Sequence, residues 1–414
     1  ALGAEALTSN TTAGNNTAVG RSAMAANTTG TENVAVGAYA LDANTTASYN
    51  TAVGHDSMTN TTTGFSNAAL GQDTLRDNTT GDGNTALGYS ALLSNTTADN
   101  NTAVGRVAME VNTTGYNNTA VGSNALNANT TGINNAVLGQ NALDACTSGS
   151  QNTAVGQQAL SAVTTANGMT AVGRNALGSM IDGTNCVAVG ENAGDAKTTG
   201  DSLVAVGRNC LTAVTTGNNN TAMGTNAGLS VTTGGSNVFI GHYTGMVGPT
   251  TGSNNTYVGS NAGYQATGSN NVCLGQGSNP SANDSSNQIT LGNTSNDNLR
   301  CNDTSISSLS DRRDKTDIVD LPTGLNFLNT LRPVKFKWAT RDGNIKDGKI
   351  RAGFIAQELQ EAQSGSEYLD LVMDSNPDRL EAKQEHLIPV LVQAIKELSA
   401  KNEALEARIK TLEG

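Results

Sequence analysis

The sequence predicts a mainly β protein, in which a repetitive β-solenoid shaft of 17-residue coils is followed by a small α+β domain and a C-terminal helix. Three observations lead to this fold class. A glycine recurs every seventeen residues over the first three quarters of the chain, ordinary globular sequence begins after residue 302, and an apolar heptad pattern runs to the end. We therefore expect a shaft over residues 1–302, an α+β core over 303–378 and a coiled-coil helix over 379–414.

The repeat unit is marked by its glycine, which occurs eighteen times. The glycines follow one another in strict steps from Gly3 to Gly241 and continue nearly in step at Gly259, Gly275 and Gly292. A period of this size is typical of a chain stacked coil upon coil, each coil burying its apolar edge against its neighbours. At one strand spacing of about 4.8 Å per coil, the shaft would be roughly 85 Å long.

Two neighbouring columns of the repeat suggest the faces of each coil. The residue before the glycine is apolar in every copy, as at Val19 and Leu70, and we expect this apolar column to line the interior. The preceding residue is alanine in thirteen of the first fourteen copies, with Val137 the exception, and strand alternation would turn it outward, where another chain could approach closely. So few apolar residues per coil favour the association of identical chains.

Other columns predict the corners of the coils and a change of character late in the shaft. The N-T-T-G segments supply turn chemistry, because asparagine tolerates left-handed backbone angles and glycine adopts them freely. Leucine in the fourth place after the repeat glycine is later replaced by glycine, which predicts that the shaft ends or widens there; the positions are Gly194, Gly228, Gly245 and Gly263. An eighteen-residue step containing Pro249 predicts a bulged loop.

Composition excludes several classes of function. Only seven of the 23 Lys and Arg residues precede residue 303, so the shaft is net acidic and nucleic acid is not an expected partner. No signal peptide or run of eighteen apolar residues occurs, so we expect no membrane insertion and synthesis in a cytosol. The five cysteines form no C-x-x-C pair and are expected to be free thiols.

The sequence shows no pattern for a metal or cofactor. The three histidines share no ligand spacing, and no acidic column recurs at a fixed place in the repeat. We therefore expect no metal site, no cofactor and no glycosidase carboxylate pair built from the repeat.

The last hundred residues predict a compact module and a long helix. Apolar periodicity predicts helices over 324–331 and 356–362, strands over 334–338 and 350–355, and a helix from Arg379 onward. In that last helix two sets of residues are spaced by seven; these are Ile388, Ile395, Asn402 and Ile409 at a, and Leu391, Leu398, Leu405 and Leu412 at d. In a free parallel coiled coil this pattern favours two strands, and a fibre of three chains needs another arrangement. The alternative is an amphipathic helix packed on its own domain.

The chemical signal lies directly after the shaft, where Ser310 precedes Lys315 by five residues. A serine hydroxyl is a weak nucleophile until a base removes its proton, and a lysine serves as that base only when its pKa is lowered. Arg312 and Arg313 favour such a decrease, and Asp311, Asp314 and Asp317 oppose it; these are the neighbouring charges. Five residues place the two side chains on different faces of a helix or strand, so the chain must loop or a neighbouring chain must contribute. The alternative is an exposed loop in which both residues are incidental.

Four motifs in order carry a resemblance to a known family. S-D-x-R-x-K begins at Ser310, and L-R-P-V-K-F-K-W, G-F-I-A-Q-E and H-L-I-P-V-L-V-Q-A-I-K-E-L follow it. Residues 303–414 thereby resemble the intramolecular chaperone, auto-processing domain of phage tail spikes and tail fibres, endosialidases among them. The resemblance implies that the domain holds three chains together while the fibre folds and then cuts itself off between Leu309 and Ser310. It assigns Ser310 and Lys315 as the catalytic dyad, with Asp311 and Arg312 in support.

Two further features of the sequence bear on these resemblances. Asp314 stands where this family usually has an apolar residue. The repeats resemble, more loosely, the β-roll heads of trimeric autotransporter adhesins, whose units are typically shorter, and this implies a left-handed roll with three chains side by side.

Together these features predict the distal part of a phage tail fibre or spike. Its expected partners are two further copies of the chain, a host cell-surface receptor of polysaccharide or protein, and other tail proteins. Its expected place is the virion tail fibre, assembled in the cytoplasm of the host bacterium. The rival interpretations are a bacterial trimeric surface adhesin, a polysaccharide-depolymerase tail spike and a membrane-tethered transcription factor with the same chaperone domain.

Overall fold

The computed structural model describes residues 1–414 except 247–250, 297–309, 339–347, 375 and 379. It divides into two compact units, Ala1–Leu291 and Gly292–Gly414, and each is described by itself. The predicted Pro249 loop, Cys301 and the predicted cleavage residue Leu309 lie outside the described residues.

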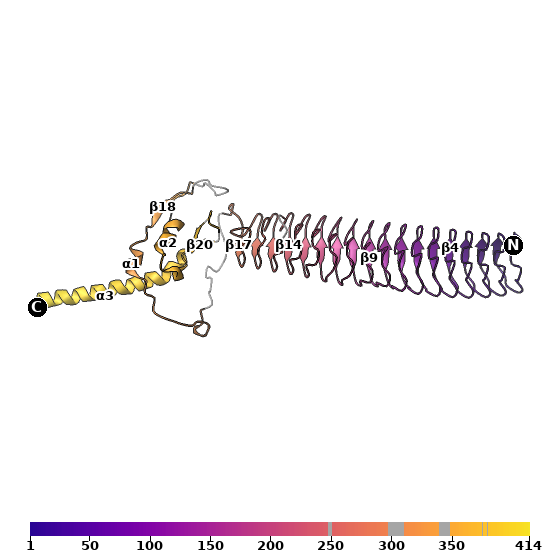
Figure 1. Ribbon diagram of the computed structural model, residues 1–414, viewed down its shortest axis with the longest axis horizontal. Helices are drawn as coiled ribbons and strands as arrows, with labels where there is room; N and C mark the ends of the chain where they lie inside the picture. The colour runs from indigo at the N-terminus through magenta and orange to yellow at the C-terminus, as the bar shows by residue number, and fades with distance from the viewer. Residues whose placement is uncertain (247–250, 297–309, 339–347, 375, 379) are drawn as a thin grey trace. The chain divides into compact units, whose positions relative to one another are not determined.

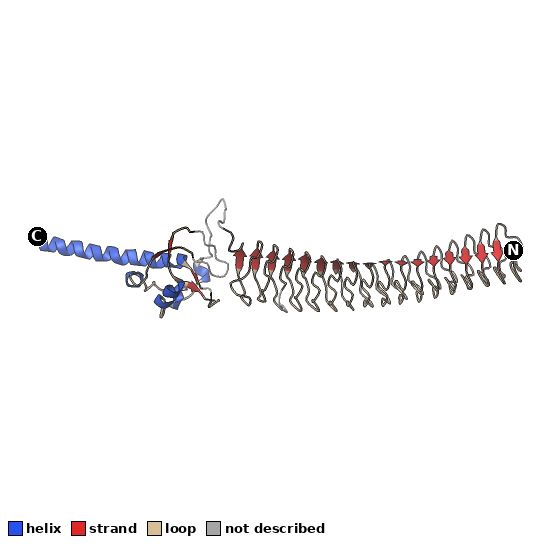
Figure 2. Ribbon diagram, turned by 90° about the horizontal axis from the view of Figure 1, so that it is seen from above, coloured by secondary structure: helices blue, strands red, loops and turns tan. Residues whose placement is uncertain are grey.

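The first unit is built on a single parallel sheet, to which each coil after the first contributes one three-residue strand (Figure 1). The first coil contributes an isolated bridge between Leu2 and Val19. Each strand pairs with the strand of the next coil in the same register, as Thr17 pairs with Val34. The seventeen strands are β1 Thr17–Val19, β2 Val34–Val36, β3 Thr51–Val53, β4 Ala68–Leu70, β5 Thr85–Leu87, β6 Thr102–Val104, β7 Thr119–Val121, β8 Ala136–Leu138, β9 Thr153–Val155, β10 Thr170–Val172, β11 Val187–Val189, β12 Val204–Val206, β13 Thr221–Met223, β14 Val238–Ile240, β15 Thr256–Val258, β16 Val272–Leu274 and β17 Ile289–Leu291. Figure 2 shows the strands in one row along one edge of the shaft, with the loops of the coils extending below them. The predicted β-solenoid is confirmed.

The faces of the strands are the reverse of those predicted from the sequence. The alanine column is buried, with Ala18 only 1% exposed, whereas the apolar column lies at the surface, with Val19 36% and Leu138 51% exposed. Our predictions that the apolar column lines the interior and that the alanines face another chain are therefore wrong. The width of the coil is the reason, because a Leu or Met from the other wall, such as Leu126, fills the interior and leaves room only for an alanine.

The leucine or methionine four places after the repeat glycine has an unusual backbone. Leu126, for example, is fully buried at a φ of 52°. A bulky residue in this left-handed region costs on the order of 1 kcal/mol, but burying a leucine side chain stabilises by about 1.5–3 kcal/mol. The gain exceeds the cost, so the strained backbone recurs from coil to coil.

The repeat glycine is required for two reasons. Gly122 has a φ of 139°, and a Cβ there would lie 2.5 Å from the carbonyl oxygen of Gly139. Both the backbone angle and this close approach exclude a side chain. The seventeen-residue period thus follows from each glycine stacking on the next.

Buried asparagines form two ladders along the coils. In the first ladder the Asn118 side chain donates to the Gly132 carbonyl at 2.9 Å and accepts from the Asn135 backbone N–H at 3.0 Å. In the second, Asn112 of an N-T-T-G segment donates to the Asn95 side chain and to the Gly115 carbonyl, both at 2.9 Å. The N-T-T-G asparagines lie outside the left-handed region, so our account of these corners was wrong: their amides hold the coils together.

Threonine interrupts the second ladder once. Thr61 takes the asparagine position, and the buried Asn44 Oδ1 and Thr61 Oγ1 are left without a hydrogen-bond partner. An unsatisfied buried polar group costs about 1–3 kcal/mol, so this coil is locally weaker than its neighbours.

The late coils with glycine in the leucine position continue the shaft to β17. Of our two alternatives, that the shaft ends or widens there, the first is wrong. Gly245 and Gly263 keep the left-handed angles of the leucines, with φ values of 58° and 59°. Phe239 and Tyr257 occupy the alanine column in these coils, and a Cβ on Gly263 would lie 2.2 Å from the Tyr257 ring. The large side chain has moved from one wall of the coil to the other, and the interior remains filled.

The second unit is a small α+β domain with a long C-terminal helix. Its elements are η1 Arg312–Asp314, α1 Leu325–Leu328, β18 Val334–Phe336, β19 Arg351–Gly353, α2 Ala356–Ala362, η2 Glu367–Leu369, β20 Val372–Met373, β21 Glu381–Ala382, η3 Gln384–His386 and α3 Leu387–Glu413. β18 pairs antiparallel with β19, and β20 with β21. The core is formed by Leu359, Leu369, Leu371, Val372, Leu387 and Val390.

Five elements were predicted for this unit; four are found where the sequence placed them, and the last helix begins later. The short strands β20 and β21 and the three 3-10 turns were not predicted. Helix α2 has the predicted bounds, while α1 and the two strands are shorter than predicted. The prediction of helix from Arg379 onward is wrong, because β21 and η3 precede α3. The β21 residues instead pair with β20 beside the core.

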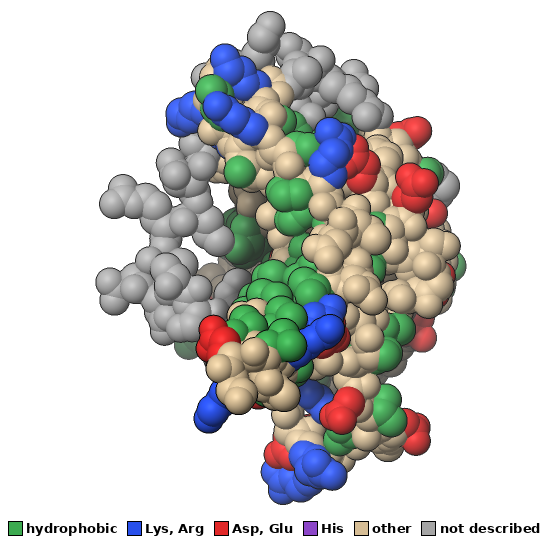
Figure 3. All heavy atoms as spheres, turned by 90° about the vertical axis from the view of Figure 1, so that its left-hand side faces the viewer, with side chains coloured by type: hydrophobic (Ala, Val, Ile, Leu, Met, Phe, Trp, Pro, Cys, Tyr) green, Lys and Arg blue, Asp and Glu red, His purple; other side chains and the backbone are tan. Residues whose placement is uncertain are grey.

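Helix α3 has two different faces. Leu387, Val390 and Ala394 are buried, and at the spacing of a helical stripe they pack toward the domain. The predicted heptad leucines and isoleucines are exposed, among them Ile395 at 66% and Leu405 at 56%. Figure 3, which looks onto the C-terminal end of the chain, shows hydrophobic side chains gathered together there. Among the described residues, no helix combines the length and apolar character needed to cross a bilayer.

Candidate functional site

The segment that carries Ser310 and Lys315 is shaped by a short 3-10 turn. Asp311 caps η1, and its side chain accepts a hydrogen bond from the Arg313 backbone N–H at 2.8 Å. The Lys315 backbone N–H donates to the Arg312 carbonyl at 3.2 Å, which reverses the chain. An aspartate at this position is a favoured cap for such a turn, because its oxygen satisfies a free backbone donor.

The turn brings the two side chains of the predicted dyad together. Lys315 Nζ lies 2.6 Å from Ser310 Oγ, within one chain. Of the two sequence alternatives, looping of the intervening chain is the one that the structure shows. At this distance an uncharged lysine nitrogen can accept the proton of the serine hydroxyl.

Neighbouring charges are arranged in pairs around the dyad. Arg313 Nη2 donates to Asp311 Oδ2 at 2.6 Å, and this hydrogen bond lowers the pKa of the Asp311 carboxyl. Arg312 contributes its backbone carbonyl to the turn, and its side chain is exposed.

The dyad is fully open to water in the single chain. All residues over 310–320 are exposed. The described residues therefore hold the two side chains in contact at an exposed position.

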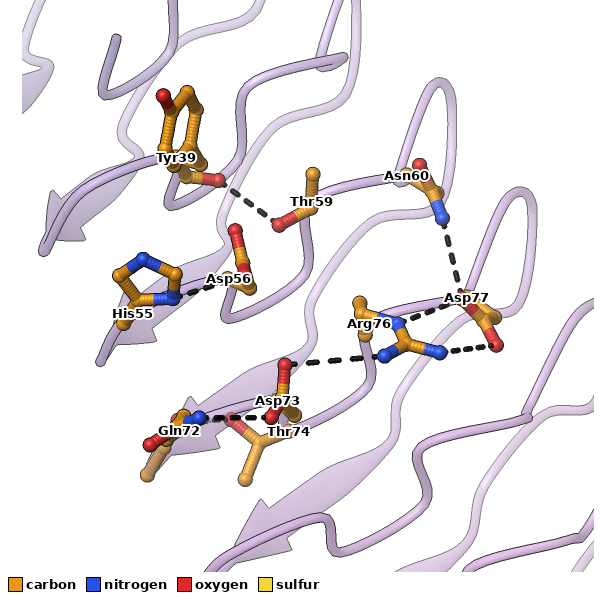
Figure 4. Close-up of polar contacts among 11 residues, drawn as sticks. Tyr39, His55, Asp56, Thr59, Asn60, Gln72, Asp73, Thr74, Arg76 and Asp77 are labelled. Atoms are coloured by element: carbon orange, nitrogen blue, oxygen red, sulfur yellow. Dashed lines mark hydrogen bonds and ion pairs between the residues drawn. The ribbon is translucent and has the colours of Figure 1, made fainter. Parts of the chain in front are cut away.

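A second candidate surface lies on the shaft, where charged and aromatic side chains of successive coils meet (Figure 4). The Arg21 guanidinium lies 5.2 Å from the centre of the Tyr39 ring, which meets the His55 ring edge-on. His55 Nδ1 is 2.9 Å from an Asp56 carboxylate oxygen. One coil further, Arg76 contacts Asp73 and Asp77. We call these seven residues the shaft patch.

Sequence analysis did not find the shaft patch. Its residues occupy columns whose identity changes from coil to coil, so the repeat consensus averages them out. The signal available was the concentration of charged and aromatic residues over 21–77 in a shaft otherwise rich in Asn and Thr.

The buried titratable groups of the shaft are structural. The four described cysteines are free and buried, and burial raises the pKa of the Cys146 and Cys273 thiols to about 11. Lys197 is fully buried, donates to the Gly217 carbonyl at 2.7 Å and has a pKa lowered by burial. Among the described residues, no group of three or more His, Cys, Asp or Glu side chains is placed to hold a metal ion.

The comparison with protein families finds one match. Residues 310–368 match the family model described as chaperone of endosialidase. The match begins at Ser310, so the dyad lies at its start, and it ends within η2. A search among curated proteins finds no match to the chain. A C-terminal match to this family, preceded by a parallel β-solenoid, fits a tail fibre or tail spike with a C-terminal chaperone domain.

Proposed function

We propose that this chain is the shaft of a bacteriophage tail fibre or spike together with an intramolecular chaperone that cuts itself off before Ser310. The observation that carries the proposal is the 2.6 Å contact between Lys315 Nζ and Ser310 Oγ at the start of the family match. Exposure of the dyad in one chain supports a cut that waits for assembly.

The proposed reaction uses only groups of the chain and water. Neutral Lys315 takes the proton of the Ser310 hydroxyl, and the serine oxygen attacks the carbonyl carbon of Leu309. The bond between that carbon and the Ser310 nitrogen breaks, the nitrogen takes up a proton, and an ester joins Leu309 to the serine oxygen. Water then hydrolyses the ester, which leaves a carboxylate on Leu309 and a free amino group on Ser310.

Intact-mass measurement under denaturing conditions tests this reaction. The parent chain should yield fragments 1–309 and 310–414, and Ser310→Ala should remain whole. A Ser310→Ala chain that still yields a fragment ending at Leu309 would overturn the assignment.

We propose a homotrimer, and the apolar column supports it. Its members form an exposed line on the strand face of the shaft; among the most exposed are Leu70, Leu87, Leu138, Met223 and Leu291. Burying apolar surface contributes about 25 cal/mol per Å², so association of identical shafts along this line would be strongly favoured. The family resemblance implies the same number of chains, and the exposed heptad face of α3 offers a second contact.

Dilution of the assembled protein tests the role of the apolar column. Leu87→Ser combined with Leu138→Ser should raise the concentration at which native mass spectrometry finds single chains by at least about tenfold. Tyr116→Ser is the matched control, because Tyr116 is 45% exposed but lies off the strand face. Equal dissociation of the two variants would contradict the proposed interface.

The proposed fibre attaches to a host cell-surface receptor and to other tail proteins within the virion. The shaft patch supports a receptor contact, because the half-buried Tyr39 ring lies between the exposed side chains of Arg21 and His55. Tyr39→Ala with His55→Ala should reduce binding of the trimer to host cells without changing its mass. Unchanged binding would remove the patch from the receptor surface.

A further inference from the structure

Helix α3 carries an acidic residue, Glu397, on the stripe that faces its own domain. Leu387, Val390 and Ala394 form the buried part of this stripe, and Glu397 continues it one turn further along. Its side chain is half-buried and reaches α1, which packs against α3. The opposite face of α3 carries the exposed heptad residues.

Glu397 supplies the missing cap of α1. The cap position of that helix is Gly324, which has no side chain to satisfy the free backbone donors of the first turn. Glu397 Oε2 accepts the Leu325 backbone N–H at 2.9 Å, and Gln393 donates to Glu397 Oε1 at 3.2 Å. A hydrogen bond to an ionised acceptor is roughly twice as strong as a neutral one.

Gly324 leaves the space that this contact needs. The residue is buried, and a Cβ there would lie 2.2 Å from Glu397 Oε1. Any side chain at this position would push the carboxylate away from the backbone of α1. The contact can therefore be broken from either partner.

This contact is one of the first ties between the dyad segment and its domain. Residues 310–320 are exposed, and the chain is then fixed in three steps. Leu321 packs against the core, the Thr323 hydroxyl bonds to the Tyr368 hydroxyl, and the Leu325 N–H bonds to Glu397. The place of Ser310 and Lys315 relative to α3 depends on these anchors.

We propose that Glu397 is a positioning residue that couples association of copies through α3 to the Ser310–Lys315 site. The inference rests on the proposed function. One face of α3 holds the start of α1, which follows the dyad segment along the chain, through Glu397. The other face is where further copies would bind. Association then brings each dyad to a fixed place beside its neighbours, where the burial that a single chain lacks can be supplied.

The test compares Glu397→Ala, Glu397→Gln and Gly324→Ala in the full-length chain. Glu397→Ala and Gly324→Ala should slow self-cleavage of the assembled protein by about tenfold or more, because a misplaced reacting group loses much of its rate. Glu397→Gln keeps an oxygen that accepts the Leu325 N–H and should remain within about threefold of the parent. Glu403→Ala is the matched control, since Glu403 is an exposed glutamate of the same helix that contacts Ser399.

Hydrogen exchange in the Ser310→Ala background gives a readout that needs no cleavage. Exchange over 310–330 should be faster in Glu397→Ala and Gly324→Ala than in Glu397→Gln or Glu403→Ala, with native mass unchanged. Unchanged exchange would overturn the proposal, and so would faster exchange with an unchanged cleavage rate. If the parent chain is never cut, the proposed processing fails, and exchange alone decides whether Glu397 holds the segment.

Discussion

The shaft and the dyad segment satisfy their polar groups in opposite ways. In the shaft the asparagines of the first ladder bind groups of the adjoining coils, so one coil completes another. Around Ser310 the polar contacts lie within a few residues, and the whole stretch is exposed to water. The interior of the shaft is therefore closed from water within one chain. The dyad segment has its local turn in one chain but no burial.

The largest expected effect is at the dyad segment. Lys315→Arg keeps the positive charge and approximate reach, but an arginine side chain does not lose its proton in proteins. Self-cleavage should fall by at least about 100-fold, the usual contribution of a general base. Time courses of intact mass measure it, and cleavage at the parent rate would show that Lys315 is not the base.

The next effect concerns the stacking of glycines in the shaft. Gly139 has a φ of 146°, and a Cβ there would lie 2.3 Å from the Gly156 carbonyl oxygen. Gly139→Ala should destabilise the shaft by about 4 kcal/mol or more, because both coils must move. Urea unfolding followed by circular dichroism measures the change.

Gly14→Ala is the control for that substitution, since nothing lies within 4 Å of a Cβ built on Gly14. Its effect should stay within about 0.5 kcal/mol. Similar losses for both variants would mean that the coils are not stacked as closely as described.

A smaller effect tests the asparagine ladder. Asn101 donates to the Gly115 carbonyl at 2.8 Å and accepts from the Asn118 N–H at 3.0 Å. Asn101→Ala leaves the buried Asn118 N–H without a partner, while the Gly115 carbonyl keeps the Asn112 amide, and should cost roughly 1–3 kcal/mol. Replacing the exposed Gln140 by alanine should cost little. A ladder loss no greater than the Gln140→Ala loss would contradict the completion of one coil by the next.

The smallest effect depends on pH and concerns one half-buried carboxyl. Burial raises the pKa of Asp144 in the shaft. At a pH below the pKa of the unfolded chain the carboxyl is neutral in both states, and as the pH rises through the folded pKa the native state must hold a charge and loses stability. Asp144→Asn should therefore raise the melting temperature by on the order of 1 °C at neutral pH and leave it unchanged in acid. A rise confined to acid would have the wrong sign.

The coils could be predicted from the sequence because their period is marked by a glycine that no other residue can replace. Gly122 must remain glycine on account of its φ and of the carbonyl above it, so the spacing survives all other variation. The faces could not be predicted, because strand alternation separates two columns without saying which one is inside. The width of the interior decides which column is buried. That width depends on leucines such as Leu126, which have a positive φ that is not expected for a leucine.

The candidate site was predictable in composition but not in geometry. The motif named Ser310 and Lys315, but their contact depends on a turn that Asp311 caps, which spacing alone does not reveal. Glu397 was missed because a glutamate in an amphipathic helix is ordinarily placed in solvent. The absence of a side chain at Gly324 leaves the space in which the Glu397 carboxylate reaches the domain.

The unshifted register of the strands has a consequence for how such shafts change in length. Since Thr17 meets Val34 just as Thr153 meets Thr170, one coil presents to its successor the same surface that it received from its predecessor. Recombination between repeats can add or delete whole coils, each altering the reach of the fibre by about 4.8 Å. The coil with Tyr257 and Gly263 is an exception, because the tyrosine ring fits only where the facing residue is glycine. These two residues must therefore be gained or lost together.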